Sequence, residues 1–164
     1  MAAPKFSAPD SDSVRSSRPK RRFTLSEANR SLPLVKRIVG DIVKTHALAM
    51  KLQHELERQV TGAAASKQTG QAGVAALQQT PQNVTMQEQL DACMTKLEDF
   101  VDELSEIGCE LKDYQMGLID FVGRHDGHDV YLCWKLGEES ITHWHELDSG
   151  FAGRQPVSKL KESK

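Results

Sequence analysis

Histidines gather in the C-terminal third of this chain, where their spacing suits metal binding. Four of the six histidines lie there: His125, His128, His143 and His145. His143 and His145 are two residues apart, so on a strand both rings would project from one face. Two neutral imidazoles on one face can bind a divalent metal such as zinc, and His125 with His128 could form a second, exposed site. The chain has no HExxH or CxxC pattern to complete a ligand set, so the alternative is polar rings on the exposed face of a sheet.

Carboxylates and one arginine share this region with the histidines. Asp120 stands out because it interrupts the apolar run GLIDF, and carboxylates do acid–base chemistry when their surroundings separate their pKa values. The alternative for Asp120 is an outward-facing strand residue. Arg154 could pair with a carboxylate such as Glu146 or Asp113 as an internal clasp, or it could hold an anionic ligand. The sequence predicts that the edge of any site is drawn from His145, Glu146, Arg154, Asp113, Asp120 and Glu138.

The cysteines give a weaker signal. Cys93, Cys109 and Cys133 lie far apart and form no CxxC pair. A sparse, odd set indicates reduced thiols rather than a disulfide framework, and it favours a cytoplasmic location. The histidines of the neighbouring strand are the only evident activators of Cys133, so the sequence does not predict a nucleophile there.

Three strands are predicted to carry these residues, at about 118–122, 130–136 and 141–147. After Asp113 the hydrophobic period falls from about 3.5 to 2, which is typical of strands. Asp126–Gly127 predicts a two-residue hairpin turn. The resulting register pairs His125 with His128, Phe121 with Leu132, Ile119 with Trp134, and Asp120 with Cys133. The turn near Gly137 decides whether Trp144, or His143 and His145, faces the apolar side, and burial of the indole favours Trp144.

Long helices are predicted before this sheet. Thr24 and Glu27 form a capping box, and Pro33 should end or kink a first helix at about 24–32. Helices at about 33–58 and 84–108 each carry an apolar seam with alternating steps of three and four residues. A loop at 60–83 separates them. The predicted fold is therefore α+β, with a long, coiled-coil-like antiparallel helical hairpin followed by a small three-stranded antiparallel sheet.

The ends of the chain differ from its body in charge. Residues 1–22 hold six Lys or Arg and two Asp, so they predict a disordered basic arm. The remaining residues hold 15 basic (21 − 6) and 21 acidic (23 − 2) side chains, and an acidic surface is a poor one for nucleic acid. Nucleic-acid contact is therefore expected only through the basic cluster at 15–22. Residues 157–164 are expected to form a frayed tail, and no apolar run predicts a membrane span.

Between Phe23 and Pro156 the chain resembles a bacterial family of small proteins that is catalogued only as a domain of unknown function. The resemblance rests on three segments: FTLSEANRSLP, GCELKDYQMGLIDF and VYLCWKLGEESITHWHELDSGFAGRQP. It implies a single α+β domain at 23–156 and a bacterial, cytoplasmic protein. It implies no activity and no catalytic residues.

Two functions remain open on the sequence alone. The first is a cytoplasmic interaction or ligand-binding module that self-associates, or binds a partner protein, through its helix seams. The alternative is a metal-dependent or acid–base enzyme with its site on the C-terminal sheet. The absence of a complete catalytic motif favours the first, and the density of His, Asp, Glu and Arg between Asp113 and Arg154 favours the second.

Overall fold

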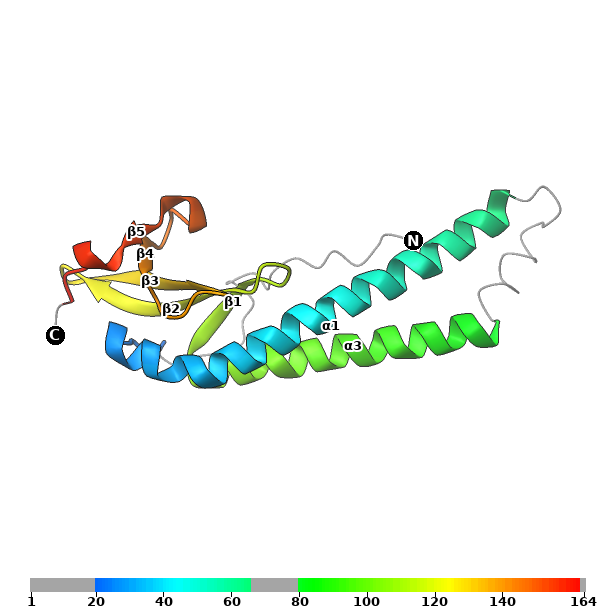
Figure 1. Cartoon of the computed structure of the whole chain (residues 1–164), viewed down its shortest axis with the longest axis horizontal. Helices are drawn as coiled ribbons and strands as arrows, with labels where there is room; N and C mark the ends of the chain where they lie inside the picture. The colour runs from blue at the N-terminus through cyan, green and yellow to red at the C-terminus, as the bar shows by residue number, and fades with distance from the viewer. Residues whose placement is uncertain (1–19, 66–79, 163–164) are drawn as a thin grey trace. The chain divides into compact units, whose positions relative to one another are not determined.

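The computed structural model describes residues 20–65 and 80–162 of the 164-residue chain. Two helices precede an antiparallel sheet, so the fold is α+β (Figure 1). The predictions for most of the arm at 1–22 and for the middle of the inter-helix loop fall on residues outside these ranges. The predicted loop at 60–83 is wrong at its described ends, because residues 60–65 and 81–83 are helical. The described residues divide into two compact units, with boundaries between residues 43 and 44 and between residues 99 and 100. None of the described helices is long and apolar enough to cross a membrane.

The first helix, α1, is continuous over Leu25–Ala65 and contains Pro33. The predicted break between helices at 24–32 and 33–58 is therefore wrong. Leu32 and Val35, on either side of the proline, are both buried. Burial of this seam outweighs the backbone hydrogen bond that a proline removes from a helix. The capping box is confirmed, because the Thr24 amide donates to Glu27 Oε2 at 2.9 Å and the Glu27 amide donates to Thr24 Oγ1 at 3.2 Å.

The second long helix, α3, spans Pro81–Ile107. Its predicted seam is buried at Leu90, Cys93, Leu97 and Leu104. Gly108 follows with a positive φ of 111° and ends the helix. The positive φ favours glycine here, and a Cβ at this position would lie only 3.0 Å from the ring of Phe23.

The sheet has five strands in the order β1-β2-β3-β4-β5, rather than the predicted three. They are β1 (Cys109–Asp113), β2 (Leu118–His125), β3 (His128–Lys135), β4 (His143–Glu146) and β5 (Gln155–Pro156). All neighbouring pairs are antiparallel. Two short 3-10 helices, η1 (Phe151–Gly153) and η2 (Val157–Lys159), flank β5. The structure thus gives regular structure to part of the predicted tail.

The hairpin between β2 and β3 has the predicted register. His125 pairs with His128, Phe121 with Leu132, Ile119 with Trp134, and Asp120 with Cys133. Asp126 and Gly127 both have positive φ, as a type I′ turn requires. Trp144 pairs with Leu132 and is buried, so the prediction that the indole faces the core is confirmed.

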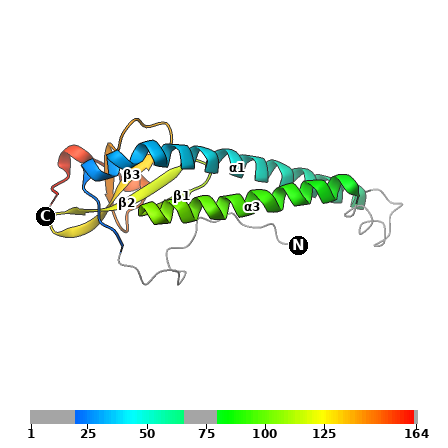
Figure 2. The same cartoon turned by 90° about the horizontal axis from the view of Figure 1, so that it is seen from below.

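The apolar face of the sheet, defined by Ile119, Phe121, Leu132, Trp134 and Trp144, is buried throughout. Phe23, just before α1, packs edge-on against Phe121 with ring centroids 4.9 Å apart. The Ile141 amide donates to Asn29 Oδ1 of α1 at 2.8 Å, which ties the segment before β4 to the helix. Both views show the N-terminal part of α1 running beside the sheet (Figures 1 and 2).

Candidate functional site

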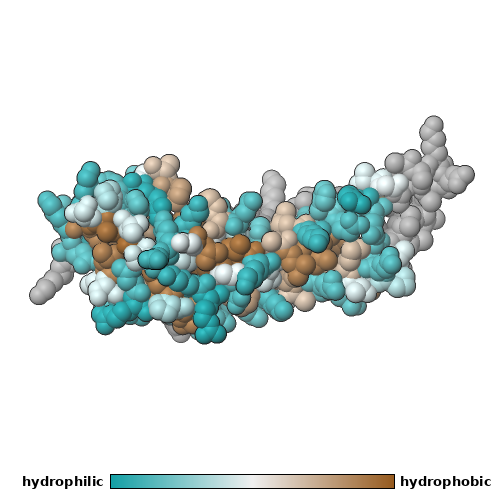
Figure 3. Space-filling view, in the orientation of Figure 1, coloured by the Kyte–Doolittle hydropathy of each residue, from teal (hydrophilic) through white to brown (hydrophobic). Residues whose placement is uncertain are grey.

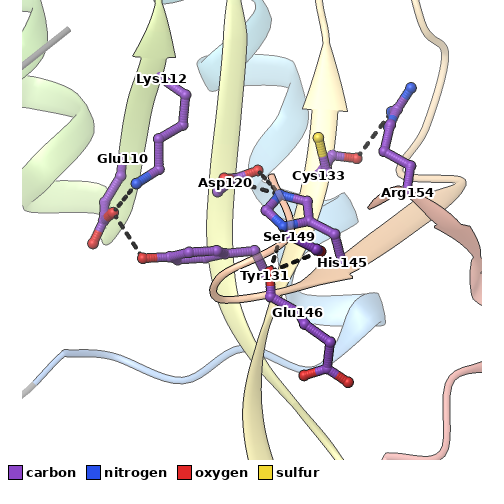
Figure 4. A network of polar contacts seen from close by, with 9 residues as sticks. All are labelled: Glu110, Lys112, Asp120, Tyr131, Cys133, His145, Glu146, Ser149 and Arg154. Carbon is purple, nitrogen blue, oxygen red and sulfur yellow. Dashed lines mark hydrogen bonds and ion pairs between the residues drawn. The ribbon is translucent and has the colours of Figure 1, made fainter. Parts of the chain in front are cut away.

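The polar face of the same sheet, which carries Glu110, Asp120, Tyr131, Cys133 and His145, holds a buried cluster of three reactive side chains. Asp120 lies across from Cys133, and His145 lies across from Tyr131, which is two residues before Cys133 on β3. One ligand atom from each of Asp120, Cys133 and His145 lies within 4.8 Å of the other two. The residues are 2%, 0% and 2% exposed. Figure 4 shows Asp120 and His145 in contact, with Cys133 on the adjacent strand.

Both ring nitrogens of His145 are engaged. Nδ1 lies 2.8 Å from the Glu146 carbonyl oxygen, which can only accept, so Nδ1 carries a hydrogen. Nε2 lies 3.2 Å from each carboxylate oxygen of Asp120. Burial lowers the pKa of His145, but the hydrogen bonds to Asp120 and to the Glu146 carbonyl outweigh burial and raise the pKa overall. The ring is therefore fixed with Nε2 directed at the carboxylate.

Burial raises the pKa of the Cys133 thiol to about 12, and the nearby Asp120 carboxylate acts in the same direction. The thiol is thus protonated at neutral pH. This matches the expectation that Cys133 is not an activated nucleophile. A metal ion would have to displace the thiol proton in order to bind.

A second group of polar contacts lies beside the cluster on the polar face. Glu110 Oε2 accepts from Lys112 Nζ at 2.8 Å and from the Tyr131 hydroxyl at 3.3 Å, and Lys20 Nζ lies 3.1 Å from Oε1. Burial raises the pKa of Glu110, but the two lysines outweigh burial and hold the pKa below its usual value. The Lys112 ammonium also lies 4.7 Å from the centre of the Tyr131 ring, and that ring is 5.4 Å from the His145 ring.

Arg154 forms an internal clasp, but its partner is not the predicted one. Its Nη2 donates to both oxygens of Glu138, at 2.8 and 3.0 Å, rather than to Glu146 or Asp113. The same nitrogen lies 3.5 Å from the Cys133 carbonyl oxygen. The clasp therefore joins the segment after β4 to the backbone of the cluster.

The other predicted site residues make separate contacts. His125 stacks on Trp144 and accepts the Lys161 amide at Nδ1, while His128 Nε2 lies 3.0 Å from a Glu146 oxygen. His143 Nδ1 lies 2.8 Å from the Thr142 hydroxyl. Asp113 accepts two backbone amides, those of Gln115 and Met116. Of the four histidines proposed for metal, the structure brings only His145 into the three-residue cluster.

Cys133 is the cluster member that sequence reasoning passed over as a site residue. The cross-strand pairing with Asp120 was the available signal. This signal was incomplete because the position of His145 depends on β4. The segment before β4 is held by the hydrogen bond between the Ile141 amide and Asn29, two residues that are far apart in sequence.

Comparison with known proteins gives a family without an assigned activity. The family model DUF2203, described as an uncharacterized conserved protein, matches residues 21–157. No curated protein and no solved structure matches the chain.

Proposed function

The chain belongs to the DUF2203 family, and from the site itself we propose that it is a binding module for a zinc-like transition metal ion. Asp120, Cys133 and His145 are the proposed ligands. The observation that carries the proposal is the convergence of three ligand atoms of different types within 4.8 Å, on three buried residues.

The orientation of His145 supports this proposal. Histidines that ligate metals usually donate their other ring hydrogen to a carbonyl or carboxylate, which fixes the ring. His145 does this with Nδ1 and the Glu146 carbonyl, and it presents Nε2 to the cluster. A bound ion would take the place of the proton between Nε2 and Asp120.

The spacing of the three groups is close to what a metal requires. Ligand atoms bound at about 2.0–2.3 Å around a tetrahedral zinc ion lie roughly 3.3–3.8 Å from one another. His145 Nε2 and Asp120 are already 3.2 Å apart, and the largest separation is within 4.8 Å. A contraction of about 1 Å at the widest pair would complete the site.

The donor types favour zinc over magnesium or calcium. Thiolate and imidazole ligands suit zinc and similar transition metals, whereas Mg²⁺ and Ca²⁺ prefer oxygen alone. Together a zinc ion, an Asp120 carboxylate and a Cys133 thiolate would have no net charge, which lowers the cost of burying them.

Elemental analysis of protein purified without an affinity tag tests the proposal. We expect about one equivalent of transition metal per chain, and much less after Cys133→Ser. Cys109→Ser is a matched control, because Cys109 is a second buried, free cysteine of the sheet that lies outside the cluster. No bound metal in the wild type, combined with unchanged stability in chelator, would contradict the proposal.

Self-association is a second proposal, supported by exposed apolar side chains in residues 44–99. The helix seams are buried, so we propose that they cover each other in an antiparallel hairpin. Leu48, Met50 and Val84 are 49%, 43% and 43% exposed, and the space-filling view shows hydrophobic patches along the helices (Figure 3). These residues are better candidates for contact with a second copy than the seams.

Sedimentation at micromolar concentration tests self-association. We expect a concentration-dependent dimer that becomes a monomer in a Leu48→Glu, Met50→Glu double variant. A wild-type chain that sediments as a monomer at every concentration would contradict the proposal.

A further inference from the structure

We infer that the metal ion proposed above keeps one exchangeable coordination position, and that this position takes a small anion such as a carboxylate. This inference rests on the proposed metal site. A structural zinc ion has four protein ligands, whereas a zinc ion with three protein ligands can bind water or a substrate in the fourth position. The inference therefore goes beyond the proposed metal site.

The surrounding carboxylates and imidazoles indicate an incomplete ligand set. Among the described residues, only Asp120, Cys133 and His145 converge as metal-type ligands. The other acidic side chains nearby are held by cations: Glu110 by Lys112 and Lys20, and Glu138 by Arg154. A tetrahedral ion would thus have a fourth position that none of these residues fills.

His143 and Glu146 also have contacts away from the cluster. His143 shares the polar face of β4 with His145, but its Nδ1 contacts the Thr142 hydroxyl. The Glu146 carboxylate contacts His128 at the exposed end of the sheet. Neither residue contributes a ligand atom to the cluster.

The charge around the cluster favours an anion in the open position. Lys112 interacts electrostatically with Asp120 and His145, and Arg154 interacts with Cys133. In Figure 4 these two cations lie on opposite sides of the cluster. Glu110 is shared by two lysines, so the Lys112 side carries a net positive charge. Arg154 is balanced by its partner Glu138, and the metal centre itself would be neutral, so the attraction for an anion comes from the Lys112 side.

The Tyr131 side of the cluster indicates how a ligand would reach it. The Tyr131 ring packs near His145 and its hydroxyl contacts Glu110. The Lys112 and Glu110 side chains are 25% and 29% exposed, whereas those of Asp120 and His145 are each 3% exposed. An anion would thus enter beside Lys112, past the Tyr131 ring, whose hydroxyl already donates its hydrogen to Glu110.

Cobalt substitution with azide as the probe tests the inference. Co²⁺ bound by a thiolate, an imidazole and a carboxylate gives visible absorption that depends on coordination number and ligand type. We expect azide to change this spectrum in a saturable way. We also expect Lys112→Met, compared with the wild type when both chains are fully loaded with cobalt, to weaken azide binding about tenfold, as loss of roughly 1.4 kcal/mol of attraction would do. Lys159→Met is the matched control, because Lys159 lies outside the site, in η2.

The possible outcomes distinguish the exchangeable position from the metal site itself. A cobalt spectrum that azide does not alter would overturn the exchangeable position and leave the metal site standing, as bidentate ligation by Asp120 would explain. Azide binding that Lys112→Met does not weaken would overturn the assigned role of Lys112. A chain that gives no tetrahedral cobalt spectrum would overturn the metal site and, with it, the exchangeable position.

Discussion

Both faces of the sheet have fully buried side chains on β2, β3 and β4, yet these side chains differ in kind. On the apolar face, Phe121, Leu132 and Trp134 are each 0% exposed. On the polar face, Asp120, Cys133 and His145 are 2%, 0% and 2% exposed. Both sets alternate along β2, β3 and β4, so the same backbone carries them.

Stability explains only one of these faces. Burial of aromatic and aliphatic groups drives folding, whereas burial of a carboxylate and an imidazole costs free energy that their pairing only partly offsets. Hydrophobic residues of similar volume would stabilise the sheet at least as well. We therefore propose that the polar face carries these groups for binding rather than for stability.

The largest expected effect concerns the apolar face. Phe121→Ala should lower the free energy of unfolding by about 3–5 kcal/mol, because it leaves a cavity against Phe23. Urea unfolding in the presence of chelator measures this change. A loss below about 1 kcal/mol would show that this face is not the core.

The buried pair on the polar face should respond differently to single and double substitution. His145→Leu alone leaves Asp120 buried without its partner and should cost about 3 kcal/mol. Asp120→Leu combined with His145→Leu should recover most of that loss, since an apolar pair replaces an ionic one. If the double variant is as unstable as the single one, the polar face is needed for folding and our distinction between the faces is wrong.

Metal binding should stabilise the chain only through the polar face. Zinc at about 100 times its dissociation constant should add about 2.7 kcal/mol to the free energy of unfolding. Cys133→Ser should remove most of this gain, while Cys109→Ser should retain it. Thermal unfolding with and without zinc measures the difference, and an equal gain in both variants would place the metal elsewhere.

The smallest expected effect is the pH dependence contributed by Glu110. Its pKa is lowered in the folded chain by Lys112 and Lys20, against the effect of burial. The ion pairs therefore add stability above the unfolded pKa of about 4.3, and this stability is lost as the pH falls through the lower, folded pKa. Glu110→Gln should cost about 1 kcal/mol or less at neutral pH.

The same variant tests the sign of this effect. Below the folded pKa of Glu110, the wild type and Glu110→Gln should be equally stable, because the wild-type carboxyl is then neutral as well. Urea unfolding of the metal-free chains at neutral and acidic pH gives the comparison. A stability difference that grows on acidification would contradict the assignment.

The parts of the fold that the sequence predicted depend on local signals. The hairpin register follows from the turn at Asp126–Gly127 and the alternation on either side of it. The helix start follows from Thr24 and Glu27. Strand β1 was missed because only Gly108 separates it from the end of α3, and β5 because it has only two residues.

The candidate site was predicted only in part because its contacts are not local. Asp120 and Cys133 are neighbours across a tight hairpin, so their pairing was predicted. The position of His145 beside Asp120 depends on the segment between Gly137 and Thr142. Asn29 of α1 accepts a hydrogen bond from the Ile141 amide in this segment. The clasp from Arg154 to Glu138 likewise depends on how two loops fold back on the sheet. No spacing pattern along the chain encodes such contacts.

X-ray absorption at the zinc edge of the zinc-loaded chain tests the central claim most directly, because it reports the atoms bound to the metal. We predict one sulfur at about 2.3 Å together with nitrogen and oxygen ligands at about 2.0–2.2 Å, and loss of the sulfur shell in Cys133→Ser. A shell of nitrogen and oxygen alone in the wild type, or a sulfur shell that persists in Cys133→Ser, would contradict the proposed site.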